Sequence, residues 1–255
     1  MPGSLSLFSL EGKNALVTGA SRGLGAAMAR GLAEAGAAVA LVARSETDLS
    51  EMASTITGRT AVIPADLSQL DEIPALIDRV EEALGGPIDI VLHAAGTQYR
   101  EPAESFPRDE WDHVMSVNLT APFLLSQEIG RRQLEASRPG SHVFVGSLTS
   151  HLSVRSVVAY TASKSAIYGV VRNLSLEWSS RGVWVNAIGP GYIRTALTQA
   201  LVDDPVRGPK LLDRIPMGRL GQPEDMVGTA VFLASDASAY VTGQLVMVDG
   251  GWSTS

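Results

Sequence analysis

Residues 14–25 read NALVTGASRGLG, an apolar run followed by three glycines in the spacing G-x-x-x-G-x-G. The run Asn14–Thr18 predicts a buried β-strand, and the glycines predict a tight turn that opens a helix near residue 22. Such a turn lets the backbone approach a pyrophosphate, whose charge meets free N–H groups and the positive end of the helix dipole. This strand–turn–helix setting favours dinucleotide binding. The common G-x-G-x-x-G spacing is absent, however, so a purely structural turn is the alternative.

The alternation of strand and helix continues along the rest of the chain. Short apolar or β-branched runs predict six further strands, at 38–43, 60–63, 88–92, 142–145, 183–188 and 245–248. Helical patterns lie at about 22–36, 46–57, 69–84, 108–136, 156–181 and 223–235. This order predicts an α/β fold of the Rossmann type, a doubly wound sheet of about seven mainly parallel strands with helices on both faces. Binding sites of such sheets lie beyond the carboxyl ends of the strands.

No linker-like segment divides the 255 residues, so we expect one domain over residues 1–255. We expect its cofactor half over about 10–150 and its catalytic and substrate half over about 151–255. Residues 189–222, rich in glycine and proline, interrupt the alternation and predict a flap over the site, with a mere surface excursion as the alternative.

Composition narrows the class of protein. The chain is 45% hydrophobic and carries a net charge of −7 without clustered lysine and arginine, so neither nucleic acid nor an anionic membrane is an expected partner. It has no cysteine, which excludes disulfides and thiolate metal sites. The N-terminus lacks the pattern of a secretory signal, and no run approaches the roughly 18 apolar residues of a membrane span. We therefore expect a cytoplasmic protein with a small-molecule substrate.

The end of the second predicted strand carries a cue to the cofactor. NAD-binding sites usually place an acidic residue here, whereas an arginine accommodates the 2′-phosphate of NADP. This chain has Arg44 here, and Ser21 and Arg22 lie in the glycine turn. NADP(H) is therefore favoured over NAD(H), with these three residues around the extra phosphate. The alternative is that both arginines are solvated surface residues.

Two further strand ends contribute to the predicted site. Asp66 and Leu67 follow the third strand and would hold the adenine. After the fourth strand, the small residues Ala94, Ala95 and Gly96 would let the backbone pass close to the cofactor. The preceding histidine, residue 93, has no second ligand at a suitable spacing, so we expect a packed side chain there and no metal site.

Ser147, Tyr160 and Lys164 supply the candidate chemistry. If residues 156–180 are helical, Tyr160 and Lys164 lie one turn apart on the same face. The lysine charge then favours the phenolate, so we expect the tyrosine pKa to fall from about 10 toward neutrality. With a serine hydroxyl alongside to hold a carbonyl oxygen, this is equipment for interconverting an alcohol and a ketone. Tyr-x-x-x-Lys alone also arises by chance on many helices.

Together these features resemble the short-chain dehydrogenase/reductase family over essentially the whole chain. The matching elements are Thr18–Gly25, Asp66, Ala95-Gly96, Asn118, Ser147, Tyr160-x-x-x-Lys164, Asn186, Pro190-Gly191 with Thr195, and Asp249-Gly250-Gly251. The resemblance implies a catalytic tetrad of Asn118, Ser147, Tyr160 and Lys164. Its tyrosine is the general acid/base and its serine holds the substrate oxygen. Its lysine binds the nicotinamide ribose and lowers the tyrosine pKa, and its asparagine supports a water-linked proton relay.

The resemblance also implies that Pro190, Gly191, Ile193 and Thr195 lie against the nicotinamide and its phosphate. The expected cofactor residues are Gly19, Ser21, Arg22, Gly23, Leu24, Gly25, Arg44, Asp66, Leu67, Ala94, Ala95, Gly96, Tyr160, Lys164, Pro190, Gly191, Ile193 and Thr195. In one departure, His93-Ala94 stands where the family usually has Asn-Asn. This removes amides that serve local sheet hydrogen bonds and adenosine-side contacts, but not the chemistry.

Within the family, the chain is most similar to sugar-acid dehydrogenases, the gluconate 5-dehydrogenase and 2-deoxy-D-gluconate 3-dehydrogenase groups. The similar stretches are 7–13, 98–100, 106–107, 110–111 and 248–252. The likeness implies an NADP(H)-dependent oxidoreductase that interconverts a secondary alcohol and a ketone, on a sugar acid or polyol. Arg100, Arg155 and Arg194 are candidate partners for a substrate carboxylate. For each of them a solvated surface role is the alternative.

Two other functions remain open at this point, a 3-oxoacyl thioester reductase and a non-catalytic NADP(H)-binding regulator. Helices 108–136 and 156–181 and the strand at 245–248 resemble the contact faces of the family, so a homotetramer is expected. The same apolar faces would also fit a monomer core.

Overall fold

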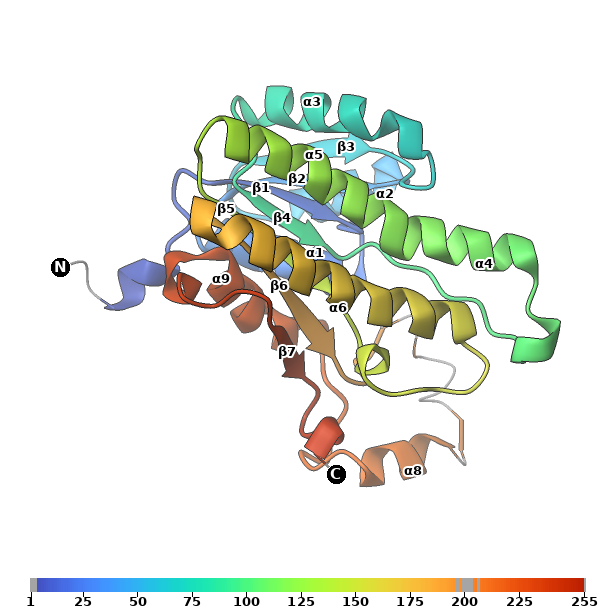
Figure 1. The fold of residues 1–255 in the computed structure, drawn as a ribbon. Coiled ribbons are helices and arrows are strands. Elements are labelled where there is room, and N and C mark those ends of the chain that lie inside the picture. Colours follow the sequence, from blue (N-terminus) through green and yellow to red (C-terminus); the bar gives the residue numbers. More distant parts are fainter. Residues whose placement is uncertain (1–3, 196–197, 199–203, 206, 255) are drawn as a thin grey trace.

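The structure is a computed structural model that describes residues 4–195, 198, 204–205 and 207–254. Seven parallel strands form one sheet in the order β3-β2-β1-β4-β5-β6-β7 (Figure 1). The strands are β1 (Asn14–Thr18), β2 (Ala38–Ala43), β3 (Thr60–Pro64), β4 (Ile90–His93), β5 (Gly140–Val145), β6 (Val183–Pro190) and β7 (Leu245–Val248). This confirms the predicted fold class. The strand order reverses between β1 and β4, the crevice where such sheets bind ligands.

Helices cover both faces of the sheet (Figure 1). They are α1 (Gly23–Glu34), α2 (Glu46–Ser54), α3 (Ile73–Leu84), α4 (Arg108–Met115), α5 (Ala121–Glu135), α6 (Val158–Trp178), α8 (Arg207–Asp213) and α9 (Val227–Ala234). Buried side chains of α1, α2 and α9 form the core on one face, and those of α3, α5 and α6 form the core on the other. Because both faces are covered, the central strands are apolar nearly throughout.

The predicted helix at 108–136 is three segments rather than one. A π-helical turn, Ser116–Thr120, separates α4 from α5. Its wider i→i+5 bonding cannot be read from a 3.6-residue pattern, and such turns often occur at functional sites. Asn118 lies in this turn and is 1% exposed.

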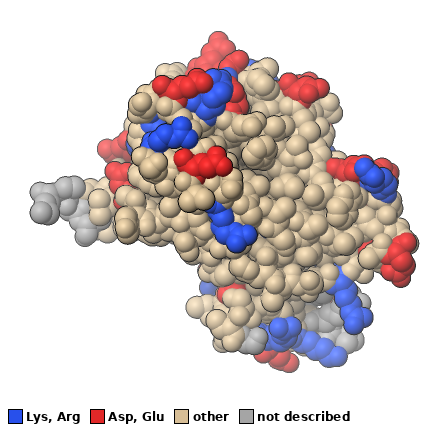
Figure 2. All heavy atoms as spheres, viewed as in Figure 1, with Lys and Arg blue, Asp and Glu red and all other residues tan. Residues whose placement is uncertain are grey.

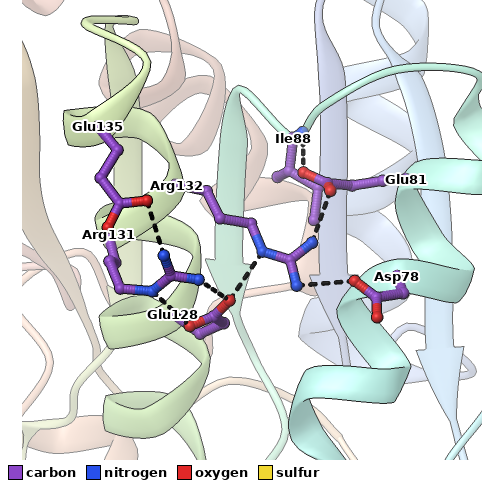
Figure 3. A network of polar contacts seen from close by, with 7 residues as sticks. All are labelled: Asp78, Glu81, Ile88, Glu128, Arg131, Arg132 and Glu135. Carbon is purple, nitrogen blue, oxygen red and sulfur yellow. Dashed lines mark hydrogen bonds and ion pairs between the residues drawn. The ribbon is translucent and has the colours of Figure 1, made fainter.

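Ion pairs fasten α5 to α3 on the surface of the second face (Figure 3). The guanidinium of Arg132 lies 2.7 Å from Asp78 and 2.7 Å from Glu81 on α3, and 2.8 Å from Glu128 on its own helix. Arg131 shares Glu128 and so extends the network. These pairs join α5 to α3, and none of the residues that form them belongs to the predicted site.

The predicted flap, residues 189–222, lies partly outside the described residues. Its described part contains α8, which the sequence did not predict. Figure 1 shows α8 and the C-terminus beyond the carboxyl ends of β6 and β7. Leu211, Ile215 and Leu220 of this segment pack in one buried cluster with Trp252 and with Leu148, the residue after Ser147. The described part is therefore packed against the loop that carries the serine.

Candidate active site

The four tetrad candidates come from three different segments that meet at the carboxyl edge of the sheet. Ser147 follows β5, Tyr160 and Lys164 stand one turn apart on α6, and Asn118 lies in the π-helical turn. Adding a Cβ to Gly96, just after β4, would place it 3.6 Å from Asn118 Oδ1 and 3.8 Å from Lys164 Nζ. The asparagine, the lysine and the end of β4 therefore border one point.

Lys164 and Tyr160 lie on the same side of α6, as their spacing predicts. The Nζ atom of Lys164 lies 5.7 Å from the centroid of the Tyr160 ring. It donates a hydrogen bond of 2.6 Å to the carbonyl oxygen of Val145, at the end of β5. The lysine is 4% exposed, and burial lowers its pKa to about 8. Its amine is thus fixed next to the tyrosine and remains mostly charged at neutral pH.

The expected lowering of the tyrosine pKa is not found, and that prediction is corrected here. Burial is the largest effect on Tyr160 and raises its pKa, while a hydrogen bond with Ser147 acts in the opposite direction. Desolvation disfavours a phenolate more than this hydrogen bond favours it. Tyr160 is therefore a neutral phenol in the structure, paired with the serine that was predicted to stand beside it.

The loop that carries Ser147 is pinned to α6. The Oγ atom of Ser147 accepts a hydrogen bond from the backbone N–H of Thr149 (3.1 Å), and Ser150 Oγ accepts one from the backbone N–H of Ser147 (3.2 Å). Ser150 also donates to the carbonyl oxygen of Lys164 (2.9 Å). These bonds fix the serine relative to the helix that carries the tyrosine and lysine. Ser150 was not predicted, because its role depends on a contact between distant segments.

Asn118 ties the π-helical turn to the β4 loop. Its Oδ1 atom accepts from the backbone N–H of Thr97, and its Nδ2 atom donates to the carbonyl oxygen of Thr97, both at 2.8 Å. The same Nδ2 atom donates to Ser163 Oγ on α6 at 3.2 Å. The asparagine side chain is therefore fully engaged in joining three segments around the site.

The glycine turn packs directly against the end of β4. Gly19 has φ +67°, and a Cβ on it would lie 2.7 Å from the backbone of Ala95, so only glycine fits. The backbone N–H of Ala95 donates to Thr18 Oγ1 (3.2 Å). Gly23, with φ +59°, opens α1. The N-terminus of α1 follows the place where the backbone of Gly19 approaches that of Ala95. This arrangement suits a pyrophosphate, so the residues present fit a bound dinucleotide.

Of the residues predicted around the adenosine end, Arg22, Arg44 and Asp66 are exposed and Leu67 is buried. Arg22 and Arg44 are exposed, and neither makes an ion pair within the part of the chain that the structure describes. Asp66 accepts from the backbone N–H and the hydroxyl of Ser68, both at 2.9 Å, and these bonds and the charge of Arg44 lower its pKa. Leu67 packs in the core next to α3, which leaves only its backbone for a ligand.

The segment after β6 reaches back to the glycine turn. A Cβ on Gly191 would lie 2.6 Å from the Cα atom of Asp249, so the chain passes close to the end of β7 there. Ile193 is 4% exposed in the core, next to the turn. The Cγ2 atom of Thr195 lies 3.8 Å from the Cβ position of Gly23. The structure thus brings Pro190–Thr195 and the glycine turn to one place, as a shared cofactor site requires.

The three predicted substrate arginines, Arg100, Arg155 and Arg194, are exposed. Arg194 lines a surface cavity of about 600 Å³ with Arg219, and no tetrad residue lines that cavity. Burial raises the pKa of Tyr192, and the charges of Arg214 and then Arg100 partly oppose that rise.

His93 is packed, as expected. It stacks on Phe144 with ring centroids 4.4 Å apart, and its Nε2 atom lies 2.7 Å from Ser126 Oγ. Within the described ranges, no group of three or more His, Asp or Glu side chains is arranged to hold a metal. The same ranges contain no helix that is long and apolar enough to cross a membrane.

A neutral phenol, a buried ammonium and a serine near a glycine turn that fits a dinucleotide are typical of a nicotinamide-dependent oxidoreductase. A family model described as enoyl-(acyl carrier protein) reductase matches residues 19–253. The chain belongs to the short-chain dehydrogenase/reductase family, and it is an enzyme of the dehydrogenase/reductase class. The family resemblance inferred from the sequence is confirmed.

Three relatives illustrate the similarity. The chain is 43% identical to the 2-dehydro-3-deoxy-D-gluconate 5-dehydrogenase of Escherichia coli, over 97% of this chain and 98% of that protein. It is 40% identical to the gluconate 5-dehydrogenase of Gluconobacter oxydans, over 98% of both. It superposes on a crystal structure of a gluconate 5-dehydrogenase from Burkholderia cenocepacia in complex with NADP and tartrate with a TM-score of 0.92. That match has 36% identity and covers 99% of this chain and 100% of the other.

Proposed function

We propose that the protein is an NADP(H)-dependent oxidoreductase that interconverts a secondary alcohol and a ketone on a sugar acid of the gluconate type. The observation that carries this proposal is full-length similarity to enzymes named for sugar-acid substrates, at 40–43% identity in the two relatives above. The complete Asn118, Ser147, Tyr160 and Lys164 set at the carboxyl edge supports it.

A bound nicotinamide would supply or accept the hydride. Ser147 donates its hydroxyl hydrogen to the substrate oxygen and Tyr160 holds the proton that this oxygen gains during reduction. Because burial raises the pKa of Tyr160, the phenol is protonated at neutral pH and ready to act as the acid. Lys164, whose pKa is about 8, stabilises the phenolate that is left after the transfer. Asn118 fixes the loop after β4 by accepting a hydrogen bond from the backbone N–H of Thr97.

NADP(H) is the proposed cofactor because of the charges at the adenosine end. Arg22 is an exposed cation within the glycine turn, directly after Ser21, and Arg44 is an exposed cation just past the end of β2. The Burkholderia relative is described as bound to NADP. Arg44→Asp should lower the ratio of kcat/KM for NADP to that for NAD by about 10- to 100-fold, because a charge-assisted phosphate contact is replaced by repulsion. An unchanged ratio would contradict this assignment of the cofactor.

The decisive experiment is a substrate comparison with purified enzyme. D-gluconate with NADP, 5-keto-D-gluconate with NADPH and an acetoacetyl thioester with NADPH separate the proposed function from a 3-oxoacyl thioester reductase. Tyr160→Phe should keep NADPH binding and lose at least about a hundredfold in turnover, since positioned acid–base transfer typically contributes that much or more. If the wild-type enzyme binds NADPH but turns over none of these substrates, a cofactor-binding regulator is favoured instead.

The assembly, the domain limits and the location are also proposals. We propose that residues 1–255 act as one domain, because strands from both halves pair in one sheet.

We also propose a homotetramer, because the helices at 108–136 and 156–181 and strand β7 resemble the contact faces of the family. Sedimentation velocity tests this oligomeric state. A large apolar side chain, Leu176 on α6, is 83% exposed, which fits burial by another subunit. The cytoplasmic location stays a prediction, to be tested by cell fractionation.

A further inference from the structure

Ser156, four residues before the candidate proton donor Tyr160, has an uncommon backbone conformation. Among the residues that the structure describes, it shares a positive φ with one other residue that is not glycine: φ is +62° at Ser156 and +51° at Ser137. A side chain disfavours this left-handed region, so such a residue calls for a reason in the surrounding structure.

For Ser137 the reason is local. Its backbone N–H donates to the carbonyl oxygen of Leu134 (3.2 Å), and the next N–H, of Arg138, donates to the carbonyl oxygen of Gln133 (2.8 Å). These two bonds form a turn that commonly ends a helix, here α5, and it uses a left-handed residue. Ser137 is therefore explained by the end of its own helix.

Ser156 is held instead by a segment far away in the sequence. It lies in the turn before α6, and its carbonyl oxygen accepts a hydrogen bond of 3.1 Å from the backbone N–H of Glu101, in the loop after β4. Its side chain is exposed and has no hydrogen-bond partner in the part of the chain that the structure describes. The direction of a carbonyl depends on the φ and ψ of its residue, so leaving the left-handed region would turn this oxygen away from Glu101.

The segment from Gly96 to Glu101 runs beside the part of α6 that carries Tyr160. At its start, a Cβ on Gly96 would lie 3.8 Å from Lys164 Nζ. At its end, Glu101 bonds to Ser156, just before the helix begins. Tyr160 lies between these two contacts along the chain. The residues between the ends of the segment therefore pass the proton donor.

Hydrogen bonds and an aromatic contact fix this segment. Both backbone groups of Thr97 bond to the side chain of Asn118 at 2.8 Å, and the rings of Tyr99 and Phe106 meet edge to face, with centroids 5.7 Å apart. Within the described ranges, no ion pair joins residues 96–101 to α6. Figure 2, in the same view as Figure 1, shows mostly uncharged side chains along the outer face of α6. The bond to Ser156 thus fixes one end of the segment and Asn118 fixes the other.

We propose that Ser156 is a positioning residue, whose left-handed backbone holds Gln98–Arg100 as one wall of the substrate site beside Tyr160. The inference rests on the proposed function, because it names a residue that aligns the substrate of that reaction. A wall fixed at both ends is preorganised, and displacing it weakens substrate binding although the reacting groups are unchanged. The sequence does not reveal this role, since a serine before a helix ordinarily predicts a side-chain cap.

The test varies how well residue 156 accepts a positive φ, with the substrate among D-gluconate, 5-keto-D-gluconate and the acetoacetyl thioester that wild type turns over. Ser156→Val should raise KM about tenfold, because a β-branched residue leaves the left-handed region and the bond to Glu101 breaks. The values of kcat and of the Kd for NADPH should change by less than about twofold, since the tetrad and the glycine turn are intact. Ser156→Gly and Ser156→Asn accept a positive φ and should keep the wild-type KM within about twofold.

Ser137→Val is the matched control, because it makes the same change at the other left-handed serine. It should lower the urea midpoint as Ser156→Val does and leave KM unaffected. Hydrogen exchange over residues 97–107, measured by mass spectrometry, reports on the segment without turnover. Exchange should be faster in Ser156→Val and unaltered in Ser137→Val and Ser156→Gly. If Ser156→Val does not fold, Ser156→Thr, which is also β-branched but keeps the hydroxyl, replaces it.

Each outcome decides one question. If wild type turns over the thioester but no sugar acid, the proposed function fails, and the same variants test Ser156 with the thioester. If wild type turns over none of the substrates, there is no reaction to align and both fail. The inference fails alone if Ser156→Val keeps the wild-type KM, if Ser137→Val raises KM as much, or if Ser156→Gly behaves like Ser156→Val. A rise in KM confined to the β-branched variant at 156, with faster exchange over residues 97–107, supports it.

Discussion

Acidification is expected to weaken the fold through two histidines buried in one hydrogen-bonded chain. His93 Nε2 lies 2.7 Å from Ser126 Oγ, which lies 3.0 Å from His142 Nδ1. His142 Nε2 lies 3.0 Å from Gln133 Oε1, and Gln133 Nε2 donates to the Ile88 carbonyl oxygen (3.1 Å). The glutamine oxygen must accept, so His142 Nε2 carries its hydrogen and Nδ1 accepts from Ser126. Ser126 in turn accepts from His93. Both imidazoles are therefore neutral, each in one tautomer.

The size of the effect follows from the pKa values. Burial lowers the pKa of His142 from 6.5 to about 3. Burial, followed by the charges of His142 and Lys164, holds the pKa of His93 well below 6.5. The unfolded chain binds protons at these histidines near pH 6.5 and the folded chain does not, so stability is full above that pH and falls steadily below it. His142 alone should cost about 2 kcal/mol between about pH 6.5 and pH 5.

Urea titrations followed by circular dichroism, at one protein concentration and several pH values, measure this loss. His142→Gln should be less stable than wild type at neutral pH, because the hydrogen-bonded chain is interrupted. Its stability should nevertheless fall less steeply with acid, by up to about 1.4 kcal/mol per pH unit. His113→Gln changes an exposed histidine and should leave the slope unaltered. The reasoning is refuted if wild type and His142→Gln share one slope below pH 6.5.

Two further predictions concern the glycine turn and the ion-pair network. Gly19→Ala should raise the Kd for NADPH at least about tenfold, measured by fluorescence titration. The new Cβ would lie 2.7 Å from the Ala95 backbone. Gly12→Ala is the control, because Gly12 also has a positive φ but has no atom within 4 Å of the added Cβ. This control should cost only backbone strain of about 1 kcal/mol and leave cofactor binding intact. Arg132→Leu should lower the free energy of urea unfolding by about 1 kcal/mol, less so in high salt. Arg108→Leu, which removes an ion pair whose arginine is 86% exposed, should change it by no more than a few tenths; equal effects of the two would contradict a role for the network.

The strands were predictable because fully covered strands are apolar along their whole length. All seven predicted runs are strands, with ends shifted by no more than two residues. The π-helical turn around Asn118 and α8 were missed. A single i→i+5 turn leaves no mark on a helical pattern, and α8 lies in a stretch whose glycines and prolines predict a loop. The series of hydrogen bonds from His93 to Gln133 could not be predicted from the sequence either, because it joins a strand end to partners 33 or more residues away.

The tetrad shows where local spacing stops being informative. A four-residue interval on a helix fixes which side Tyr160 and Lys164 share, and both side chains lie there. The sign of the tyrosine pKa shift is not set by that interval, since it depends on how much water the whole fold removes from both groups. The same burial that raises the phenol pKa lowers the lysine pKa to about 8, so each group is moved toward its neutral form. A buried lysine held by the Val145 carbonyl therefore acts mainly when the phenol gives up its proton, by stabilising the anion that forms. In the resting site the phenol remains a proton donor for reduction.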